Sequence, residues 1–433
     1  MGESLSQLAA AAASDMFPAD MDLTLTSRRP ARLPSATIEI VAAAPVPSSD
    51  RPAAEPPDVS VVVVTYNNLL FTKLCLGSLI RHTSEPPFEV IVVDNGSTDG
   101  TREYLCAVAE ANPNVEVVLN RNNRGFAAAN NQGLALAKGR TLILLNNDTV
   151  LPQGWMSRLV AHVEDPAVGL VGPVTNRIGN EAEIEVTYRD YGGMLRLAEE
   201  GARAEAGRSF DIPMPAMFCL AMRRDVYERI GPLDERFEVG LLEDDDYARR
   251  ARDAGYRLVC AEDVFVHHFG QASFGELVPT GDYMRLLKAN QRRYEEKWGE
   301  PWKPYGRRTS RRYARLVPRL KEMLARHVPA GSTVLVASRG DDDLLRLNDV
   351  TAWHFPRLPD GTYAGCYPAD SAAAVQHLEE STAAGAQYLL LPQTAAWWLD
   401  YYAGFARHLA QRCRVVDRSE GVGVLFDLTR SMA

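Results

Sequence analysis

The 433-residue chain lacks several features that define other classes of protein. No run approaches the roughly 18 consecutive apolar residues of a membrane-spanning helix, so a bilayer-spanning protein is not expected. The first residues hold no basic segment followed by an apolar core and a small-residue cleavage site. That absence argues against a secretory signal and favours a cytoplasmic location, with peripheral contact at the inner face of the membrane left open.

Paired cysteines and an excess of positive charge are also missing. The six cysteines stand singly, without the Cys-x-x-Cys pair of a zinc site or redox motif, so we expect reduced and mostly buried thiols. A net charge of -9 argues against general nucleic-acid binding, because phosphate backbones attract surfaces rich in Lys and Arg. The length predicts two domains and an appendage.

The pattern of apolar residues changes abruptly near residue 58. Residues 1–57 are rich in Ala, Pro, Ser and Asp without an apolar period, which predicts a disordered N-terminal arm. In residues 58–300, short apolar runs alternate with helix-length segments; the runs are residues 59–64, 90–93, 115–119, 141–145 and 168–171. Such runs are typical of an α/β fold, a parallel sheet with helices on both faces. Residues 179–210 are polar and Gly-interrupted, which predicts an insertion or mobile loop.

Two further segments follow this domain. Residues 301–328 interleave arginines with leucines, which predicts a basic linking helix. Two interpretations of residues 303–327 stay open: a solvated surface, or contact with anionic lipid headgroups or a lipid-linked acceptor. Residues 329–433 predict a small α/β domain of unassigned role, with strands at 333–337, 388–391 and 423–426. Its first strand is not followed by a Gly-x-Gly-x-x-Gly turn, so dinucleotide binding is not expected there.

Polar clusters follow four successive strands of the larger domain. In an open α/β sheet, ligands bind at the carboxyl ends of the strands. The clusters are Thr65-Tyr66-Asn67, Asp94-Asn95-Gly96-Ser97-Thr98-Asp99, Asn120-Arg121-Asn122-Asn123-Arg124-Gly125 and Asn146-Asn147-Asp148. Each cluster alone is explained by turns and caps; Ser97 or Thr98, for example, would cap a helix over 102–110. Four in succession indicate a ligand site.

Together with two later motifs, these clusters resemble the family 2 inverting glycosyltransferases of the GT-A fold, rhamnosyltransferase-like members included. The resemblance covers about half the chain and also includes Asn123-Arg124-Gly125-Phe126-Ala127-Ala128-Ala129-Asn130-Asn131, Glu243-Asp244-Asp245-Asp246-Tyr247-Ala248-Arg249-Arg250 and His268-Phe269-Gly270-Gln271-Ala272-Ser273. It implies a Rossmann-like sheet that binds a nucleotide-diphosphate sugar.

The resemblance implies a donor site at the first strand ends. Asp94 would accept a hydrogen bond from the N3–H of a uracil or thymine ring, because an ionised carboxylate is only an acceptor. Thr65 and Asn67 would line the same pocket. The other residues that the resemblance assigns to the donor are Tyr66, Asn95, Gly125, Asn130, Asn146 and Asn147.

The resemblance also implies a divalent cation, Mg²⁺ or Mn²⁺. Family members often carry Asp-x-Asp after the fourth strand, but Asn146 stands at the first of these positions, so Asp148 alone supplies a carboxylate. His268 would be the second protein ligand, and imidazole suits Mn²⁺ better than Mg²⁺. His267 would point to the opposite face of the strand.

The acidic run that starts at Glu243 implies the catalytic base. In the resemblance, Asp244 draws the proton from the acceptor hydroxyl as it attacks the anomeric carbon, and one such carboxylate suits a single displacement with inversion. Glu243 and Asp246 would be supports, and Arg250 would pair with Asp246 one helical turn away. Capping by acidic residues is the simpler explanation of part of this run.

We therefore predict a metal-dependent, inverting transferase that moves sugar from a UDP- or dTDP-sugar to a hydroxyl of a glycan or lipid-linked acceptor in cell-surface polysaccharide or cell wall synthesis. A nucleotidyltransferase would need a Gly-rich segment with Arg and Lys after the first strand. A methyltransferase or dehydrogenase would need a Gly-rich turn at 65–68, which has no glycine. A non-catalytic nucleotide-sugar-binding protein would have lost Asp244, Asp148 or His268. The formation of a homo-oligomer stays open.

Overall fold

The computed structural model describes residues 25, 35–48, 56–184, 186, 188–270, 282–302, 311–338, 341–347, 349–358, 361–364, 368, 370–396, 398–419 and 421–429. The chain divides into two compact units. The first comprises Met1–Ser27, Ala31–Gly275 and Leu286–Glu300, and the second comprises Arg28–Pro30, Glu276–Arg285 and Pro301–Ala433. No helix in the described part of the chain is long and apolar enough to cross a membrane.

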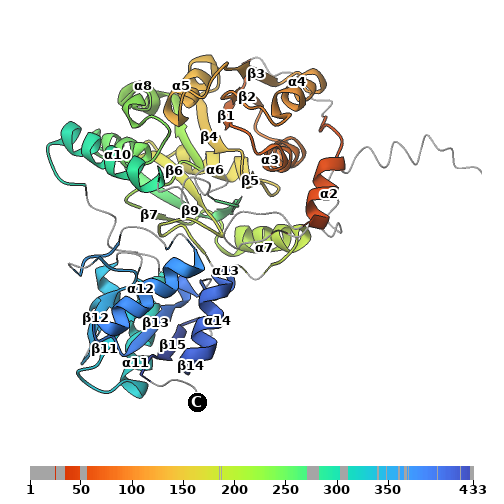
Figure 1. The fold of residues 1–433 in the computed structure, drawn as a ribbon. Coiled ribbons are helices and arrows are strands. Elements are labelled where there is room, and N and C mark those ends of the chain that lie inside the picture. Colours follow the sequence, from red (N-terminus) through yellow and green to blue (C-terminus); the bar gives the residue numbers. More distant parts are fainter. Residues whose placement is uncertain are drawn as a thin grey trace, which may run out of the picture. The chain divides into compact units, whose positions relative to one another are not determined.

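An eight-stranded sheet forms the centre of the first unit, in the order β3-β2-β1-β4-β8-β6-β9-β7 (Figure 1). Its strands are β1 (Val59–Thr65), β2 (Phe88–Asp94), β3 (Val115–Leu119), β4 (Thr141–Asn146), β6 (Val168–Val174), β7 (Ser209–Asp211), β8 (Cys219–Arg223) and β9 (Arg257–Phe265). Strands β1 to β4 pair in parallel, and β8 runs antiparallel to β4. All five predicted apolar runs are therefore strands of this sheet.

Helices cover both faces of the sheet. Helices α3 (Leu69–His82), α4 (Thr101–Ala111) and α6 (Trp155–Val163) share one hydrophobic cluster with it, and α5 (Phe126–Leu136), α8 (Arg224–Ile230) and α9 (Glu243–Asp253) share another. Strand β1 contributes to both clusters, because Val61 and Val63 point to one face and Val62 points to the other. This double coverage explains the continuous apolar runs.

Smaller elements complete the first unit. Strands β5 (Thr149–Val150) and β10 (His267–His268) form a separate antiparallel pair. The short 3-10 helix η1 (Glu235–Phe237) precedes α9, and α10 (Asp282–Trp298) follows the sheet in sequence.

Two predicted irregular segments contain regular structure. Residues 179–210 hold helix α7 (Tyr191–Ala204) and the start of β7, so the predicted loop is wrong there. The Asp190 side chain caps α7 by accepting a bond from the Gly193 amide at 2.7 Å, and Met194 and Ala198 are buried. Within the predicted N-terminal arm, residues 35–43 form helix α2 (Ser35–Ala43), and Val41 lies in a hydrophobic cluster with α3. Burial against other elements stabilises these two helices, which local sequence signals alone do not reveal.

The second unit is a five-stranded sheet in the order β12-β11-β13-β15-β14. Its strands are β11 (Thr333–Val336), β12 (Thr351–His354), β13 (Tyr388–Pro392), β14 (Arg414–Ser419) and β15 (Gly423–Asp427). One face packs against α11 (Arg311–His327) and the 3-10 helix η3 (Asp342–Leu345). The other packs against α12 (Ser371–Ala383), α13 (Trp398–Tyr401) and α14 (Ala403–Arg412). The three predicted strands are present, and β12 and β14 extend the sheet.

The structure refines the prediction of a basic linking helix. The basic segment is helical over α11, but Leu320, Met323 and Leu324 are buried against the small sheet, so α11 is part of that unit's core and not a separate linker. Residues 303–310 of the segment lie outside the described residues. The aromatic side chains of Phe355 and Trp398 are core residues at 1% exposure each.

Candidate active site

The parallel register brings the predicted polar clusters to one edge of the large sheet. Thr65 at the end of β1 is aligned with Asp94 at the end of β2, and Val64 is aligned with Asn146 at the end of β4. Asp94 is in turn aligned with Leu119 at the end of β3. The four strands therefore end in one row, and the segments that follow them are neighbours.

Asp94 is a hub between these segments. Its carboxylate is fully buried, and its Oδ2 accepts bonds from the amides of Gly96 at 3.2 Å and Ser97 at 3.1 Å and from Arg102 at 3.2 Å. Its Oδ1 accepts one bond from the Thr65 hydroxyl at 3.2 Å. A carboxylate oxygen has two acceptor directions, so Oδ1 keeps capacity for one more donor.

The turns after β1 and β2 are interlocked. Asn67 adopts a left-handed conformation with φ 53, its amide donates to the Ser97 hydroxyl at 2.7 Å, and its Oδ1 accepts from the Thr98 amide at 2.8 Å. The prediction that Ser97 or Thr98 caps the next helix is wrong. The N-cap residue of α4 is Gly100, and the Asp99 carboxylate just before it accepts from the Thr101 amide at 3.2 Å. Tyr66 remains 41% exposed at this edge.

Two residues of the predicted donor site, Asn95 and Asn130, make hydrogen bonds within the protein. The Asn95 side chain donates to Asn123 at 2.8 Å and to the Gly125 carbonyl at 3.1 Å, and it accepts from the Arg124 amide at 2.9 Å. With a fourth bond, accepted from the Asn120 side chain at 3.2 Å, both the donor and the acceptor group of the Asn95 amide support the loop. Asn130 is 1% exposed and donates to the Phe126 carbonyl inside α5 at 2.9 Å.

Asp148 and His268 meet beside the end of β4. The pairing of β5 with β10 aligns His268 with Thr149, and the His268 Nε2 lies 3.4 Å from the Asp148 Oδ1. The His268 Nδ1 lies 3.0 Å from the Arg177 carbonyl, which only accepts, so Nδ1 carries a proton. In the neutral ring, Nε2 is then the nitrogen with a free lone pair, and it faces Asp148.

Neighbouring groups fix this histidine in place. The Phe218 ring stacks on it at 4.6 Å, and Asn176 bonds both its backbone amide, at 2.7 Å, and its carbonyl, at 3.1 Å. His267 is turned to the Tyr188 hydroxyl at 2.5 Å, and burial lowers the pKa of His267 to about 3. Asn176 and Arg177 were missed by sequence reasoning because they lie about 90 residues from His268 and belong to no quoted motif.

A carboxylate oxygen and an imidazole nitrogen that face each other are a donor set that fits Mn²⁺ or a similar divalent cation. The described residues contain no group of three or more His, Cys, Asp or Glu side chains that could hold a metal, so these residues offer two ligands. Asn147 donates to the Thr72 hydroxyl at 2.9 Å, which directs its side chain toward α3. Asn146 accepts from the Thr149 hydroxyl through its backbone carbonyl at 2.9 Å, and its side chain is half-buried.

The acidic run forms the first turn of α9. Two non-glycine residues with positive φ, Leu241 at 77 and Leu242 at 72, lead directly into it. Burial raises the pKa of the half-buried Asp244, whose Oδ1 accepts from the Asp245 amide at 3.0 Å. Burial, together with the charges of Asp244 and Asp245, raises the pKa of Glu243 well above its ordinary value.

Asp246 has a different environment from its acidic neighbours. It is fully buried and bonds Arg250 at 3.0 Å, as predicted, and it also bonds Lys297 at 2.7 Å and the Trp298 ring nitrogen at 3.0 Å. These contacts connect α9 to α10. The Lys297 and Trp298 contacts were missed because α10 lies about 50 residues further along the chain.

Comparisons with known proteins identify the family. Residues 60–231 match the family model of Glycosyl transferase family 2. Glycosyltransferase AglE of Haloferax volcanii is 33% identical over 224 residues, which cover 51% of this chain and 70% of that protein. The chain belongs to glycosyltransferase family 2. It is therefore a glycosyltransferase, and the GT-A fold class predicted from the sequence is confirmed.

Other relatives of this glycosyltransferase match it over smaller shares of their own length. The O-antigen biosynthesis protein RfbC of Myxococcus xanthus is 28% identical over 258 residues, which cover 57% of this chain and 20% of that protein. An undecaprenyl-phosphate 4-deoxy-4-formamido-L-arabinose transferase of Pseudomonas savastanoi is 34% identical over 161 residues, 32% of this chain and 46% of that protein. Among solved structures, the mannosyltransferase PcManGT from Pyrobaculum calidifontis, in complex with GDP-Man and Mn²⁺, is 21% identical with a TM-score of 0.42 and covers 61% of this chain and 71% of that chain.

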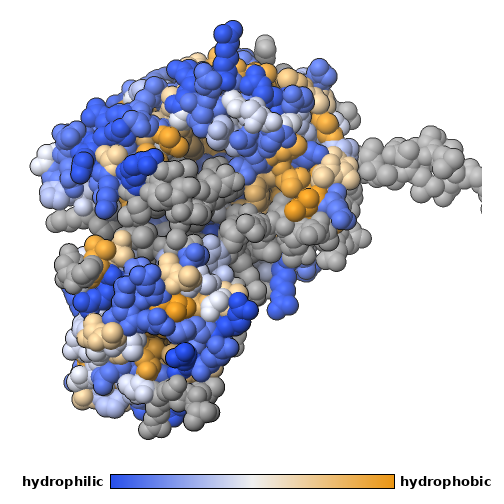
Figure 2. Space-filling view, in the orientation of Figure 1, coloured by the Kyte–Doolittle hydropathy of each residue, from blue (hydrophilic) through white to orange (hydrophobic). Residues whose placement is uncertain are grey.

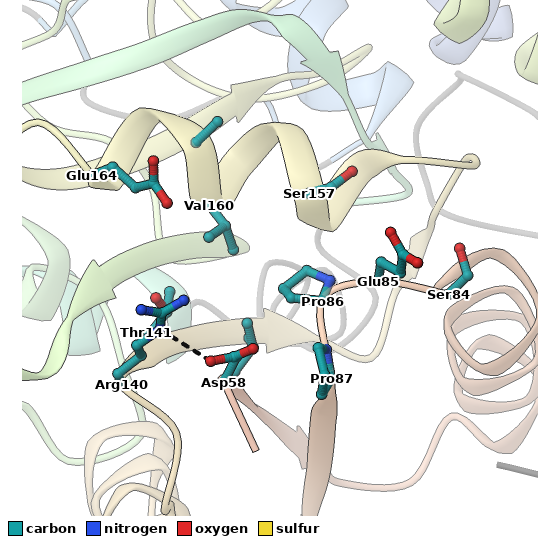
Figure 3. A pocket seen from close by; sticks show the side chains of 12 residues that line it. Asp58, Ser84, Glu85, Pro86, Pro87, Arg140, Thr141, Ser157, Val160 and Glu164 are labelled. Atoms are coloured by element: carbon teal, nitrogen blue, oxygen red, sulfur yellow. Dashed lines mark ion pairs between the residues drawn. The ribbon is translucent and has the colours of Figure 1, made fainter. Parts of the chain in front are cut away.

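A separate cavity of about 580 Å³ lies at the opposite edge of the glycosyltransferase sheet (Figure 3). It is lined at the amino ends of β1, β2 and β4 by residues that include Asp58, Pro87 and Thr141. Figure 3 shows Arg140 directed toward Asp58, with which it forms an ion pair at 3.1 Å. The cavity is thus distinct from the row of strand ends that carries the predicted site.

The burial of Glu243 predicts a pH-dependent stability. A carboxyl whose folded-state pKa is raised favours folding at low pH, and that contribution is lost as pH rises from the ordinary value of 4.5 through the folded pKa. Glu243→Gln removes this loss, so the variant should gain stability over the natural protein above about pH 5. Denaturation midpoints measured from about pH 4 to about pH 8 test this, with Glu228→Gln, on the exposed side of α8, as control. A stability difference that stays constant with pH for Glu243→Gln contradicts the assignment.

Proposed function

We propose that this glycosyltransferase inverts the anomeric configuration of a UDP- or dTDP-sugar donor and transfers the sugar to a hydroxyl of a glycan or lipid-linked acceptor. The observation that carries the proposal is the half-buried Asp244 carboxylate, whose pKa is raised by burial, at the start of α9. A single displacement requires one base on the face opposite the leaving group. Asp244 fits that role because a raised pKa strengthens a carboxylate as a base.

The donor half of the proposal rests on Asp94 and the interlocked turns. The Asp94 Oδ1 accepts only one bond among the described residues, from Thr65, so it is able to accept the N3–H of a uracil or thymine ring. Tyr66 is exposed at the same edge and offers an aromatic face to a base. Asn67 holds the two turns together through its backbone amide and its side-chain Oδ1, and so shapes the proposed nucleotide site.

The cation half rests on Asp148 and His268 as the two protein ligands. A bound divalent cation would neutralise the charge that develops on the departing diphosphate. The protein's own contribution is orientation: the Arg177 carbonyl fixes the proton on the His268 Nδ1, and Phe218 holds the ring in its plane. Asn146, at the position where many family members have a carboxylate, leaves Asp148 as the anionic ligand.

In the chemical step, the Asp244 carboxylate accepts the proton of the acceptor hydroxyl. The hydroxyl oxygen forms its bond to the anomeric carbon as the bond from that carbon to the diphosphate oxygen breaks, and the diphosphate leaves with that electron pair. The names of the relatives RfbC and the undecaprenyl-phosphate transferase support an acceptor in O-antigen or lipid-linked sugar assembly. Family membership and the presence of Asp244, Asp148 and His268 favour catalysis over nucleotide-sugar binding alone and over nucleotidyl transfer.

Asp244→Asn should lower turnover by roughly 10²- to 10⁴-fold, because the amide cannot accept the proton in the transition state. Donor affinity, measured by the thermal shift that a nucleotide sugar produces, should stay unchanged. Asp253→Asn is the matched control, since this carboxylate lies on the same helix, is 58% exposed and contacts Arg249 at 3.6 Å. Undiminished turnover in Asp244→Asn would remove the base assignment.

His268→Ala should weaken Mn²⁺ binding to the protein with UDP by at least about tenfold, because one of two protein ligands is lost. The free Mn²⁺ signal in electron paramagnetic resonance measures this without reference to turnover. The control is His162→Ala, which breaks another buried His–Asp pair, with Asp263 at 2.7 Å; His162 lies on α6 and is not part of the predicted site. Equal Mn²⁺ affinity in both variants, or full activity in excess chelator, argues against the cation site.

A further inference from the structure

The buried side chain of Asn290, on α10, contacts the turn that leads into α9, the helix that carries the proposed base Asp244. Asn290 is fully buried, and its Nδ2 donates to the carbonyls of Phe237 at 3.0 Å, Gly240 at 2.7 Å and Leu241 at 2.9 Å. The amide has two hydrogens for three acceptors, so one hydrogen is shared. The visible surface over α8 and α10 is mostly hydrophilic (Figure 2), and within residues 285–298 of α10 the buried side chains are those of Asn290 and Tyr294.

The turn needs such a clamp because its backbone is strained. Between η1 and α9, Glu238 has φ 52, Leu241 has φ 77 and Leu242 has φ 72, all in the region that side chains other than glycine rarely adopt. Such conformations persist where surrounding contacts hold them. The N-terminus of α9 has no side-chain cap; among the described residues, the three bonds from Asn290, together with the Arg293–Glu238 ion pair, hold this turn.

The other side of the turn packs against the loop that follows β3. A Cβ at Gly125 would lie 2.0 Å from the Glu238 carbonyl oxygen, so the turn packs directly on this glycine. The Asn131 side chain accepts from the Leu233 amide and donates to its carbonyl, each at 2.9 Å. The segment before Asp244 is thereby held between the loop after β3 and α5 on one side and Asn290 on the other.

The orientation of the Asn290 amide is defined by its surroundings. Three carbonyls face its nitrogen, and its Oδ1 accepts from Arg293 at 2.7 Å, so exchange of the oxygen and nitrogen would place like groups together. Arg293 also pairs with Glu238 of the turn. Asp246 contacts α10 through two other residues, Lys297 and Trp298. These contacts connect α10 to α9 itself and not to the turn before α9.

We propose that Asn290 is a positioning residue, which fixes the 237–242 turn so that the Asp244 carboxylate faces the acceptor hydroxyl. The proposal rests on the assignment of Asp244 as the base under the proposed function. Asn290 bonds only the protein backbone and Arg293 in the described residues, and it acts on the reaction through Asp244. A displacement of a catalytic group by about 1 Å lowers turnover by roughly 10²-fold.

The test is Asn290→Leu, which is close in size and removes the donor. We expect kcat to fall by about tenfold to hundredfold while the donor KM changes by less than about threefold, because the lost interaction acts in the transition state. Asn112→Leu is the matched control: Asn112 is also fully buried and donates to two carbonyls, of Pro47 at 2.7 Å and Val108 at 2.8 Å, at the end of α4. The control should lose thermal stability and keep its kcat.

The outcomes separate this inference from the proposed function. Suppose that Asp244→Asn is inactive. If folded Asn290→Leu then keeps full kcat, or if Asn290→Leu and Asn112→Leu lose kcat equally, Asn290 is not a positioning residue and the base assignment stands. If Asp244→Asn keeps its turnover, both assignments are overturned. Should the leucine variant not fold, Asn290→Asp is measured instead, since it keeps the bond from Arg293 and loses the donor. The same fall in kcat is expected there, and unchanged kcat overturns the proposal.

Discussion

The parallel pairing of β1 with β2 and β4 is the constraint on which the proposed donor site depends. It places Thr65, Asp94 and Asn146 at one edge of the sheet. The buried Asp94 carboxylate then joins β1, the turn after β2 and α4 through four hydrogen bonds. A buried carboxylate is costly unless it is paired, so these donors hold the turns in the one arrangement that satisfies it.

The proposed base at the start of α9 depends on burial and on the pairing of its acidic neighbours. The first turn of α9 contains several carboxylates whose surroundings differ. Asp246 is neutralised by Arg250 and Lys297, whereas burial raises the pKa of Asp244. One carboxylate thus anchors the helix to α10 while its neighbour keeps the raised proton affinity of a base. The turn that Asn290 contacts also packs against Gly125 in the loop after β3, so it connects the two proposed sites.

Local patterns in the sequence predict the features that short-range physics controls. Five of the eight strands of the large sheet follow from apolar runs, and the Asp246–Arg250 pair follows from helical spacing. The roles of the asparagine side chains were not predictable, because an Asn amide can bind either a ligand or other groups of a loop. Asn95 binds Asn123 and Gly125, and only the folded loop shows it. Helix α7 and the Asn290 clamp arise from contacts between segments distant in sequence, which periodicity does not encode.

The central claim is that one carboxylate drives a single displacement at the anomeric carbon. A panel of nucleotide sugars with Mn²⁺ first identifies the donor as the ligand that raises the unfolding temperature. The anomeric configuration of the transferred sugar, determined by nuclear magnetic resonance from the coupling at its anomeric carbon, then tests the claim directly. The account predicts a product whose configuration is opposite to that of the donor. A product that retains the donor configuration would contradict it, because retention requires a second displacement or another geometry.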